Sequence, residues 1–390
     1  MNRTLILLRT MEGVFMLKKS NIDKRYLFIS LILSIFVTYY IIIVCYMYRI
    51  SIIIPVYNVQ KYIGRCLESI FAQECSNADI ECILVDDCCQ DDSMEIVAQK
   101  LNVYAGSIRF VIKSHSVNCG HCTARNTGLE DAHGDYVLFV DSDDALKPGA
   151  ISYFVDELDK NGTNVDVIVG NAFSSRDDKS MMYLGKEPEL IDNREEEGLR
   201  RLLAREMFQH SWNKMVKKKF LTENGLSFYD GIINEDLLWS YLLFLHAKTI
   251  LVLPGVTYIY EADNSDSITN TPYRRMQKII TSRITICNKI LSSPPRKMIE
   301  EYYTYLFFSF MRALDFYEKD RKVFNQYQDE VYSIRDRLLK DVKKRRYYVL
   351  YLFFLTSVKP FYYVTYLRLF RRYFNYITKK VVALDKIVHF

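Results

Sequence analysis

Residues 136–144, Tyr-Val-Leu-Phe-Val-Asp-Ser-Asp-Asp, decide the fold that we expect for this chain. Their opening apolar run predicts a buried strand, which ends abruptly at Asp141, Asp143 and Asp144. Carboxylates crowded at the end of a buried strand repel one another and lose hydration, so they favour a site for a cation. Oxygen ligands at this density are typical of Mg²⁺ or Mn²⁺, although an acidic turn in water would contain the same residues.

Strands and helices alternate at short spacing before and after this stretch. Such alternation predicts a mostly parallel sheet with helices on both faces, and such sheets bind ligands beyond the carboxyl ends of their strands. Asn58, Asp87 and Asp143 each follow a predicted strand, so we expect them to share one site. The predicted strands are 50–55, 80–85, 108–112, 136–140 and 165–169, and the predicted helices are 62–72, 93–101 and 123–132. Further helices are expected at 298–318 and 323–340.

Polar residues outside the acidic strand extend the candidate site. A carboxylate of Asp86 or Asp87 can accept hydrogen bonds from a base or a ribose, while the residues after them suit the cap of the next helix. The guanidinium fork of Arg125 is suited to a diphosphate, although an arginine on a helix surface is common.

A second acidic pair, Glu235-Asp236, precedes an apolar helix. It can serve as a helix cap, or Asp236 can act as a general base on a hydroxyl. Trp212 and Lys214 offer a ring and a cation, which suit a sugar and a phosphate. Cys119-Gly-His-Cys122, together with His115, resembles zinc-ligand spacing, but no second Cys-x-x-Cys accompanies it.

Charge and cysteine content set the class of protein. Residues 340–390 hold 12 Lys and Arg against 2 Asp and Glu, while the net charge of the whole chain is +5. A basic end on a mildly acidic body predicts an anionic partner for that end. The nine cysteines form no disulfide framework, so we expect reduced thiols in the cytosol.

The N-terminal segment 1–48 is ambiguous. Residues 26–48 form an uncharged run long enough to span a bilayer. The preceding lysines and arginine would keep that end inside and export the body, which conflicts with reduced cysteines. The segment is therefore a membrane anchor, an extension upstream of a true start at Met47, or an uncleaved signal-like segment.

The C-terminal region 271–390 reads as helical. Between Tyr347 and Tyr376 there are 13 Phe and Tyr, interleaved with basic residues. This composition suits the headgroup layer of an anionic leaflet, or a helical tail packed on the body. A nucleic-acid partner is not expected.

The motifs together resemble the family 2 glycosyltransferases of the GT-A fold, in particular bacterial members that build capsule, exopolysaccharide or lipopolysaccharide. The resemblance covers roughly residues 50–270, which defines a catalytic domain at 49–270. It lies in six segments that occur in the order and spacing of the family: Ile52-Ile-Ile-Pro-Val-Tyr-Asn58, Val85-Asp-Asp87, Ala124-Arg-Asn126, Asp141-Ser-Asp-Asp144, Trp212-Asn-Lys214 and Glu235-Asp236.

The resemblance implies an inverting enzyme. It would move a sugar from a nucleoside-diphosphate sugar, most simply a uridine one, to a hydroxyl of a glycan or lipid-linked acceptor. Asp236 would be the catalytic base with Glu235 beside it, and Asp143, with Asp141, would bind Mn²⁺ or Mg²⁺. Trp212 and Lys214 would line the acceptor or diphosphate side, and Ser267-Ile268 would close over the donor. The donor would be held by Pro55, Tyr57, Asn58, Asp86, Asp87, Arg125, Asn126, Asp141 and Asp143. The resemblance also implies that the protein acts at the cytoplasmic side of the cell membrane, to which it would be attached peripherally or by a single pass.

One departure from the family concerns the residues after the paired aspartates, where Cys88-Cys89 replaces Gly-Ser. The loss of glycine removes a residue that tolerates unusual backbone angles.

Three other classes of protein share parts of this pattern. A phosphorelay receiver would place its acidic pair after the first strand, and a sugar-phosphate nucleotidyltransferase would need a Gly-rich loop near that strand. A non-catalytic nucleotide-sugar-binding module is opposed by the intact Asp143 and Asp236.

Overall fold

The computed structural model of the chain separates into two units, residues 1–47 and 48–390. In the first unit, β1 (Ile6–Thr10) and β2 (Gly13–Leu17) pair antiparallel. All other elements belong to the second unit. The structure describes residues 6–10, 13–17, 47–162, 164–176, 181, 184–204, 207, 209–262, 276–296, 301–303, 305–306 and 321–344.

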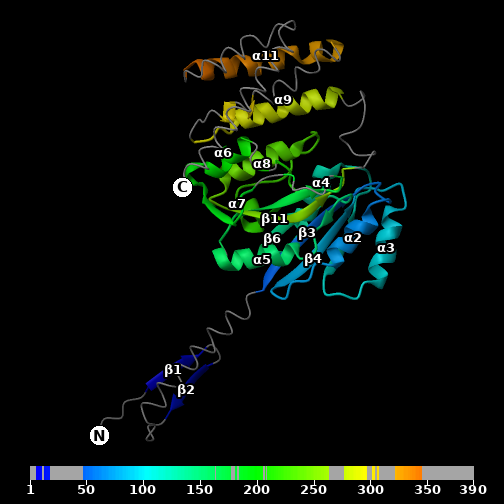
Figure 1. The fold of residues 1–390 in the computed structure, drawn as a ribbon, viewed down its shortest axis with the longest axis vertical. Helices are drawn as coiled ribbons and strands as arrows, with labels where there is room; N and C mark the ends of the chain where they lie inside the picture. The colour runs from blue at the N-terminus through cyan, green and yellow to red at the C-terminus, as the bar shows by residue number, and fades with distance from the viewer. Residues whose placement is uncertain are drawn as a thin grey trace. The chain divides into compact units, whose positions relative to one another are not determined.

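A nine-stranded sheet is the centre of the second unit (Figure 1). Its strands lie in the order β5-β4-β3-β6-β10-β8-β11-β7, and β9 also pairs with β11. Their bounds are β3 Tyr48–Val56, β4 Ala78–Asp86, β5 Arg109–Ser114, β6 Tyr136–Phe139, β7 Ala145–Leu146, β8 Val167–Ser174, β9 Glu189–Asp192, β10 Lys214–Lys217 and β11 Thr249–Tyr260.

The sheet is mixed, whereas the sequence predicted a mostly parallel one. The first four strands in the order, β5, β4, β3 and β6, are parallel neighbours as expected. Beyond them β10 runs antiparallel to both β6 and β8, and β11 pairs antiparallel with β7 and β9. The four residues of β10 and the two of β7 are too short to show a period in the sequence.

Helices cover both faces of the sheet, because successive strand residues point to opposite sides. On β3, Ile53 packs in one hydrophobic cluster, whereas Ile52 and Ile54 pack in the other. The helices are α2 Ile63–Phe71, α3 Ser93–Val103, α4 His121–Asp131, α5 Ala150–Asn161, α6 Glu197–Leu203, α7 Lys218–Glu223, α8 Glu235–His246, α9 Met276–Ser292 and α11 Arg321–Lys344, with a 3₁₀ turn at Asn193–Glu195. The predicted helices at 62–72, 93–101, 123–132 and 323–340 thus correspond to α2, α3, α4 and α11.

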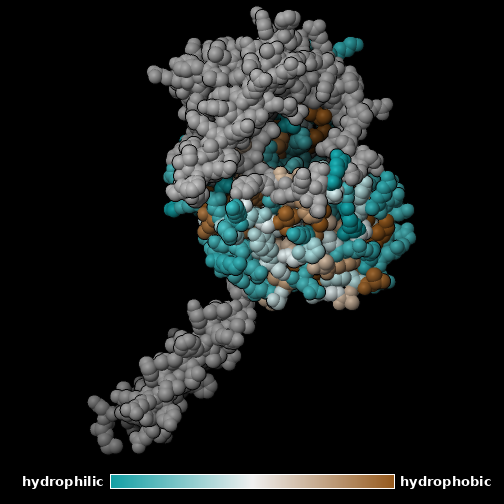
Figure 2. All heavy atoms as spheres, in the orientation of Figure 1, coloured by the Kyte–Doolittle hydropathy of each residue, from teal (hydrophilic) through white to brown (hydrophobic). Residues whose placement is uncertain are grey.

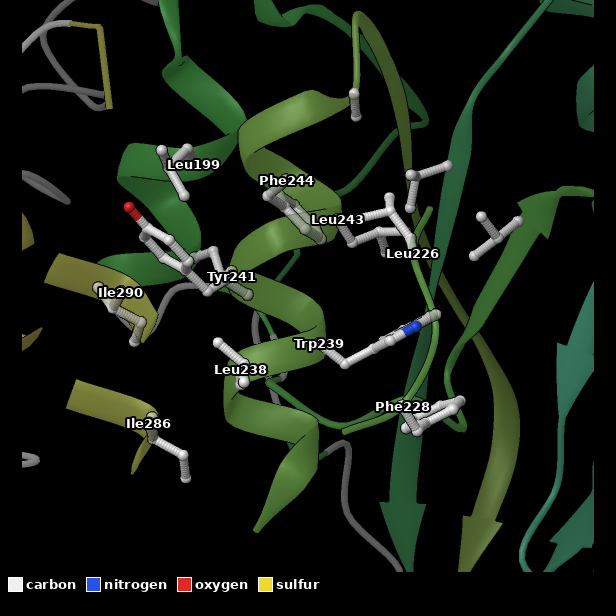
Figure 3. Close-up of a cluster of buried hydrophobic side chains, with 14 of the residues drawn as sticks. Leu199, Leu226, Phe228, Leu238, Trp239, Tyr241, Leu243, Phe244, Ile286 and Ile290 are labelled. Atoms are coloured by element: carbon white, nitrogen blue, oxygen red, sulfur yellow. The ribbon is translucent and has the colours of Figure 1, made fainter. Parts of the chain in front are cut away.

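Helix α8 is apolar on two sides, and this double packing fixes its N-terminus at the sheet edge. Figure 3 shows Trp239 on the side of the sheet next to Phe228, with Ile286 and Ile290 of α9 across the helix. The rings of Trp239 and Phe228 stack at 4.9 Å, and Phe139 of β6 meets Trp239 edge-on at 5.7 Å. Both contacts hold the helix whose first residues are Glu235 and Asp236.

Several predicted features lie outside the described residues, namely most of 26–48, the segment Ser267-Ile268, most of 298–318, and the basic aromatic region 347–376. Within the described part of the chain, none of the helices combines the length and the apolarity needed to cross a membrane. Hydrophobic residues on the face drawn in Figure 2 are scattered among hydrophilic ones. The eight cysteines within the described ranges are all free thiols.

Candidate active site

The carboxyl ends of β3, β4 and β6 lie side by side. In the register of these parallel strands, Val56 is opposite Asp86, and Ile53 is opposite Phe139. The residues that follow the three strands therefore meet at one edge of the sheet. They include Tyr57-Asn58, Asp86-Asp87 and Asp141, which the sequence assigned to one site.

Arg125 connects the separate motifs at this edge. It lies in the first turns of α4 and its side chain is 4% exposed. Its Nη2 donates to Oδ1 of Asp141 at 2.6 Å, and its Nη1 donates to Oε1 of Glu235 at 2.7 Å. Asp236 Oδ1 lies 3.9 Å from the same Nη1. One guanidinium thus brings together carboxylates from positions 141, 235 and 236.

The charges explain why a buried arginine is stable here. Burial alone would lower the pKa of Arg125, but the negative charges of Asp141, Asp236 and Glu235 raise it well above its ordinary value. The Cζ atom also lies 5.1 Å from the centre of the Phe228 ring. Asn126, the next residue, accepts from the backbone N–H of Phe228 at 2.8 Å and donates to its carbonyl at 2.9 Å. Asn126 therefore holds the loop that carries this ring.

Glu235 is held from two directions at the start of α8. His121 Nε2 and Arg125 Nη1 each lie 2.7 Å from its Oε1. Burial raises the pKa of Glu235, but the hydrogen bond from His121 and the charge of Arg125 outweigh burial and leave it below the ordinary value. The helix N-terminus also favours a negative charge at this position.

Asp236 is less constrained than its neighbour. Its Oδ1 is buried and has no hydrogen-bond partner among the described residues. The side chain is 18% exposed, and its Oδ2 lies 3.7 Å from Nδ1 of His210. A carboxylate at a partly open surface is suited to accept a proton, although its buried Oδ1 is not the oxygen that a substrate could reach.

The acidic loop after β6 is fixed from β11. Tyr258 donates its hydroxyl to Asp144 Oδ2 at 2.6 Å and accepts the backbone N–H of Asp141 at 3.1 Å. The N–H of Glu261 donates to Asp144 Oδ1 at 2.7 Å. Arg65 of α2 donates to the carbonyl of Asp143 at 2.8 Å and pairs with Glu261.

These contacts test whether the loop fits a divalent cation. Burial, together with the negative charges of Asp143 and Asp141, raises the pKa of Asp144 well above its ordinary value and so favours its neutral form. Asp144 is buried and Asp141 Oδ1 bonds Arg125, whereas the Asp143 side chain is partly exposed. The residues therefore fit a hard cation bound mainly through Asp143, with its remaining ligands from outside the protein.

Both carboxylate oxygens of Asp87 bond to the loop before α4. It is 2% exposed, and its Oδ1 lies 2.8 Å from both His115 Nδ1 and the backbone nitrogen of Cys119. Its Oδ2 accepts the N–H of Gly120 at 2.7 Å. Asp86 accepts the N–H of Cys89 at 2.9 Å and is only half-buried. Asp86 is thus the more accessible of the two carboxylates predicted to hold the nucleoside.

The turn after Asp87 contains backbone strain. Cys88 has a φ of 66°, in the left-handed region where glycine is favoured, and Asn58 has a φ of 51°. Asn58 accepts the N–H of Gln90 at 2.8 Å, which ties the ends of β3 and β4 together. Pro55 is buried within β3, while Tyr57 is 43% exposed.

Trp212 and Lys214 are buried behind the site. Trp212 is 3% exposed, and its ring stacks between His210 at 4.9 Å and Tyr258 at 4.3 Å. Lys214 is 0% exposed, and its Nζ donates to the carbonyl of His210 and to Asn213. Burial lowers the pKa of Lys214 to about 7. Both side chains were predicted to line the acceptor or diphosphate side, whereas the structure buries them beneath His210, where they are positioned to hold that ring against Asp236.

Sequence reasoning missed four residues of this arrangement: Arg65, His121, His210 and Tyr258. Arg65 and Tyr258 belong to regular elements whose motifs are apolar. His121 was noted only as part of a zinc-like spacing. Their acidic partners lie at least 26 residues away in the chain, so no local pattern indicates these pairings.

Comparison with known proteins indicates one family. Residues 51–225 match the family model described as glycosyl transferase family 2. The chain is 30% identical over 251 residues to EpsJ of Bacillus subtilis strain 168, described as an uncharacterized glycosyltransferase, with 61% of this chain and 70% of EpsJ covered.

A second relative also has a solved structure. The chain is 26% identical over 276 residues to TarS of Staphylococcus aureus strain Mu50, a poly(ribitol-phosphate) beta-N-acetylglucosaminyltransferase, with 69% of this chain and 46% of TarS covered. It therefore spans less than half of the length of TarS. The crystal structure of TarS 1–349 in complex with UDP-GlcNAc superposes with a TM-score of 0.58 at 22% identity, covering 76% of this chain and 82% of that one. This likeness confirms the predicted GT-A fold, and the chain belongs to glycosyl transferase family 2.

Proposed function

We propose that this protein transfers a sugar from a uridine-diphosphate sugar to a hydroxyl of a glycan or lipid-linked acceptor in surface polysaccharide synthesis, with inversion at the anomeric carbon. The proposal rests on the contact of Arg125 with both Asp141 and Glu235, beside Asp236. One relative, TarS, is described as a poly(ribitol-phosphate) beta-N-acetylglucosaminyltransferase, which supports a hydroxyl-bearing polymer as the acceptor.

The nucleoside would lie at the edge formed by the ends of β3 and β4. The exposed ring of Tyr57 offers a stacking surface, and Asn58 and Asp86 offer polar atoms at the same edge. Pro55 and the buried Asp87 would shape this pocket by fixing the strand end and the loop before α4. Arg125, held in place by Asn126 and Phe228, would keep Asp141 oriented toward the ribose side.

Asp143, with Asp141 next to it, would hold Mn²⁺ or Mg²⁺ at the donor diphosphate. Such a cation, when bound, acts as a Lewis acid that offsets the charge on the departing diphosphate. Asp236, whose side chain is 18% exposed, would accept the proton of the acceptor hydroxyl as that hydroxyl attacks the anomeric carbon from the opposite face. Glu235, fixed by Arg125 and His121, would position Asp236 at the start of α8.

We further propose three parts for the chain: a segment 1–48, a catalytic domain 49–270, and a helical region 271–390. The basic and aromatic composition of the last part suits attachment to the cytoplasmic face of the cell membrane, where a lipid-linked acceptor would be presented.

A donor panel tests this proposal. The full chain is incubated with nucleotide sugars and Mn²⁺, with and without glycan acceptors, and released nucleoside diphosphate is measured. We expect Asp236→Asn and Asp143→Ala to abolish transfer while their circular dichroism and thermal midpoints stay close to the original. Asp79→Asn is the matched control, because this exposed carboxylate lies at the opposite end of β4.

The outcomes separate the rival functions. Near-normal turnover by Asp236→Asn would refute its role as the base. Binding of a nucleotide sugar with neither transfer nor hydrolysis would favour a non-catalytic module. Formation of a nucleotide sugar from a sugar phosphate and a nucleoside triphosphate would favour a nucleotidyltransferase.

A further inference from the structure

Three metal-binding side chains meet outside the proposed cation site, on the loop that leads into α4. They are Asp87 after β4, His115 after β5 and Cys119 before α4. One ligand atom from each lies within 4.8 Å of the other two. We propose that Asp87, His115 and Cys119 bind a borderline-soft divalent ion such as Zn²⁺, separately from the hard cation expected at Asp143.

The donor set determines which ion is expected. A carboxylate oxygen, an imidazole nitrogen and a thiolate sulfur form a mixed O, N and S set, which selects Zn²⁺ over Mg²⁺. Bond lengths near 2.3 Å to sulfur and near 2.0 Å to nitrogen or oxygen place the ligand atoms of a tetrahedral site roughly 3.3–3.6 Å apart. The three ligand atoms lie within 4.8 Å of one another, so the side chains must adjust to reach these separations when an ion binds.

His115 is already oriented for this role. Its Nε2 lies 3.0 Å from Oγ1 of Thr127, while Nδ1 lies 2.8 Å from Asp87 Oδ1. A partner on the far nitrogen is the arrangement that fixes the ring of a metal-binding histidine. When the ion binds Nδ1, His115 stays neutral with its one ring proton on Nε2, which donates to Oγ1 of Thr127, and the thiol proton of Cys119 leaves to solvent.

The surroundings allow an ion to enter and remain. Cys119 is exposed, so the site opens to solvent, while Asp87 and His115 are 2% and 15% exposed. Oδ2 of Asp87 can keep its bond from the N–H of Gly120 while Oδ1 binds the ion. Because Cys119 opens the site to solvent, water can fill the fourth position.

A second group of three ligands consists of His121 and Cys122 at the start of α4 and Glu235 at the start of α8. It is the poorer candidate, because Oε1 of Glu235 accepts from the Arg125 guanidinium at 2.7 Å. An ion bound there would face a fixed positive charge, and Cys122 is buried with its pKa raised by desolvation. No lysine or arginine of the described residues contacts the first group.

Cobalt substitution of the full chain tests the site without any need for sugar transfer. The reduced, metal-free protein is titrated with Co²⁺ in the presence of excess Mg²⁺, and the absorption spectrum is recorded. We expect one equivalent to give a thiolate charge-transfer band and tetrahedral visible bands, which Zn²⁺ then removes. Competition with a coloured chelator gives the Zn²⁺ affinity, and Asp143→Ala should leave it unchanged.

Three single-thiol variants decide between the groups. Cys119→Ser should remove the charge-transfer band and weaken Zn²⁺ binding at least about tenfold, whereas Cys75→Ser, a half-buried thiol outside both groups, should change neither. His115→Gln should weaken binding similarly; if it fails to fold, the exposed Cys119 still provides the test. Loss of the band in Cys122→Ser but not in Cys119→Ser, or no band in the original protein, would overturn the proposal.

Discussion

Replacement of Arg125 by methionine is the most direct test of the arrangement at the sheet edge. Methionine keeps an unbranched side chain of similar length in the buried position but removes the charge and all the donors. Asp141 and Glu235 then lose their hydrogen bonds of 2.6 and 2.7 Å, and Asp236 loses its nearest positive charge.

The expected cost follows from the burial of the partners. Removal of one member of a buried ion pair costs about 3–5 kcal/mol, because the remaining charge is left unpaired. Glu235 is 5% exposed and Asp141 is 28% exposed, so most of the cost falls on Glu235. His121 still bonds Glu235, which places the estimate near the lower limit, at about 3 kcal/mol.

Urea unfolding followed by tryptophan fluorescence measures this cost. Both tryptophans of the chain, Trp212 and Trp239, are buried near the site and report on its loss. Arg125→Lys should lie between the two proteins, since lysine keeps the charge but cannot bond both carboxylates. Arg49→Met is the matched control, because the Arg49–Asp135 pair is largely exposed and should contribute less than about 1 kcal/mol.

The result that would refute this reasoning is an unfolding free energy for Arg125→Met within about 1 kcal/mol of the original at neutral pH. That value would mean that Arg125 does not hold the acidic groups together. The cost should also shrink in acid, because an unpaired, buried Glu235 becomes neutral at a higher pH than a paired one.

Three further predictions concern the same region. Cys88→Gly should stabilise the protein by about 0.5–1 kcal/mol in urea unfolding, since glycine adopts the positive φ of this residue without strain; destabilisation would contradict that account. Tyr258→Phe should cost about 1–3 kcal/mol and reduce sugar transfer, because Asp144 loses its bond of 2.6 Å inside the protein; an unchanged urea midpoint would count against it. Because the pKa of Glu235 is lowered, its ionised form stabilises the folded protein above the unfolded pKa of about 4.3, and this stabilisation is lost as pH falls through the folded pKa. The difference in unfolding free energy between the original protein and Glu235→Gln should therefore vanish in acid, and a difference that persists would argue against this account.

The sequence was sufficient to predict the first half of the sheet. The apolar runs at 50–55 and 80–85 lie within β3 and β4, and their polar ends meet at one edge because parallel neighbours share a direction. It also indicated the unusual turn at Cys88, where a missing glycine coincides with a positive φ. It did not predict β7, β9, β10 or β11, because three of these strands are four residues or shorter and β11 is interrupted by Pro254.

Local pattern thus determined the family and the fold class and indicated the acidic residues of the candidate site, because hydrophobic period and motif spacing can be read along the chain. Tertiary structure alone decided their partners. Arg125 reaches Glu235 across 110 positions, Tyr258 reaches Asp144 across 114, and Lys214 is buried. Burial and distance depend on which strands pair and which helices cover them, so a residue's environment is fixed only when the sheet is assembled.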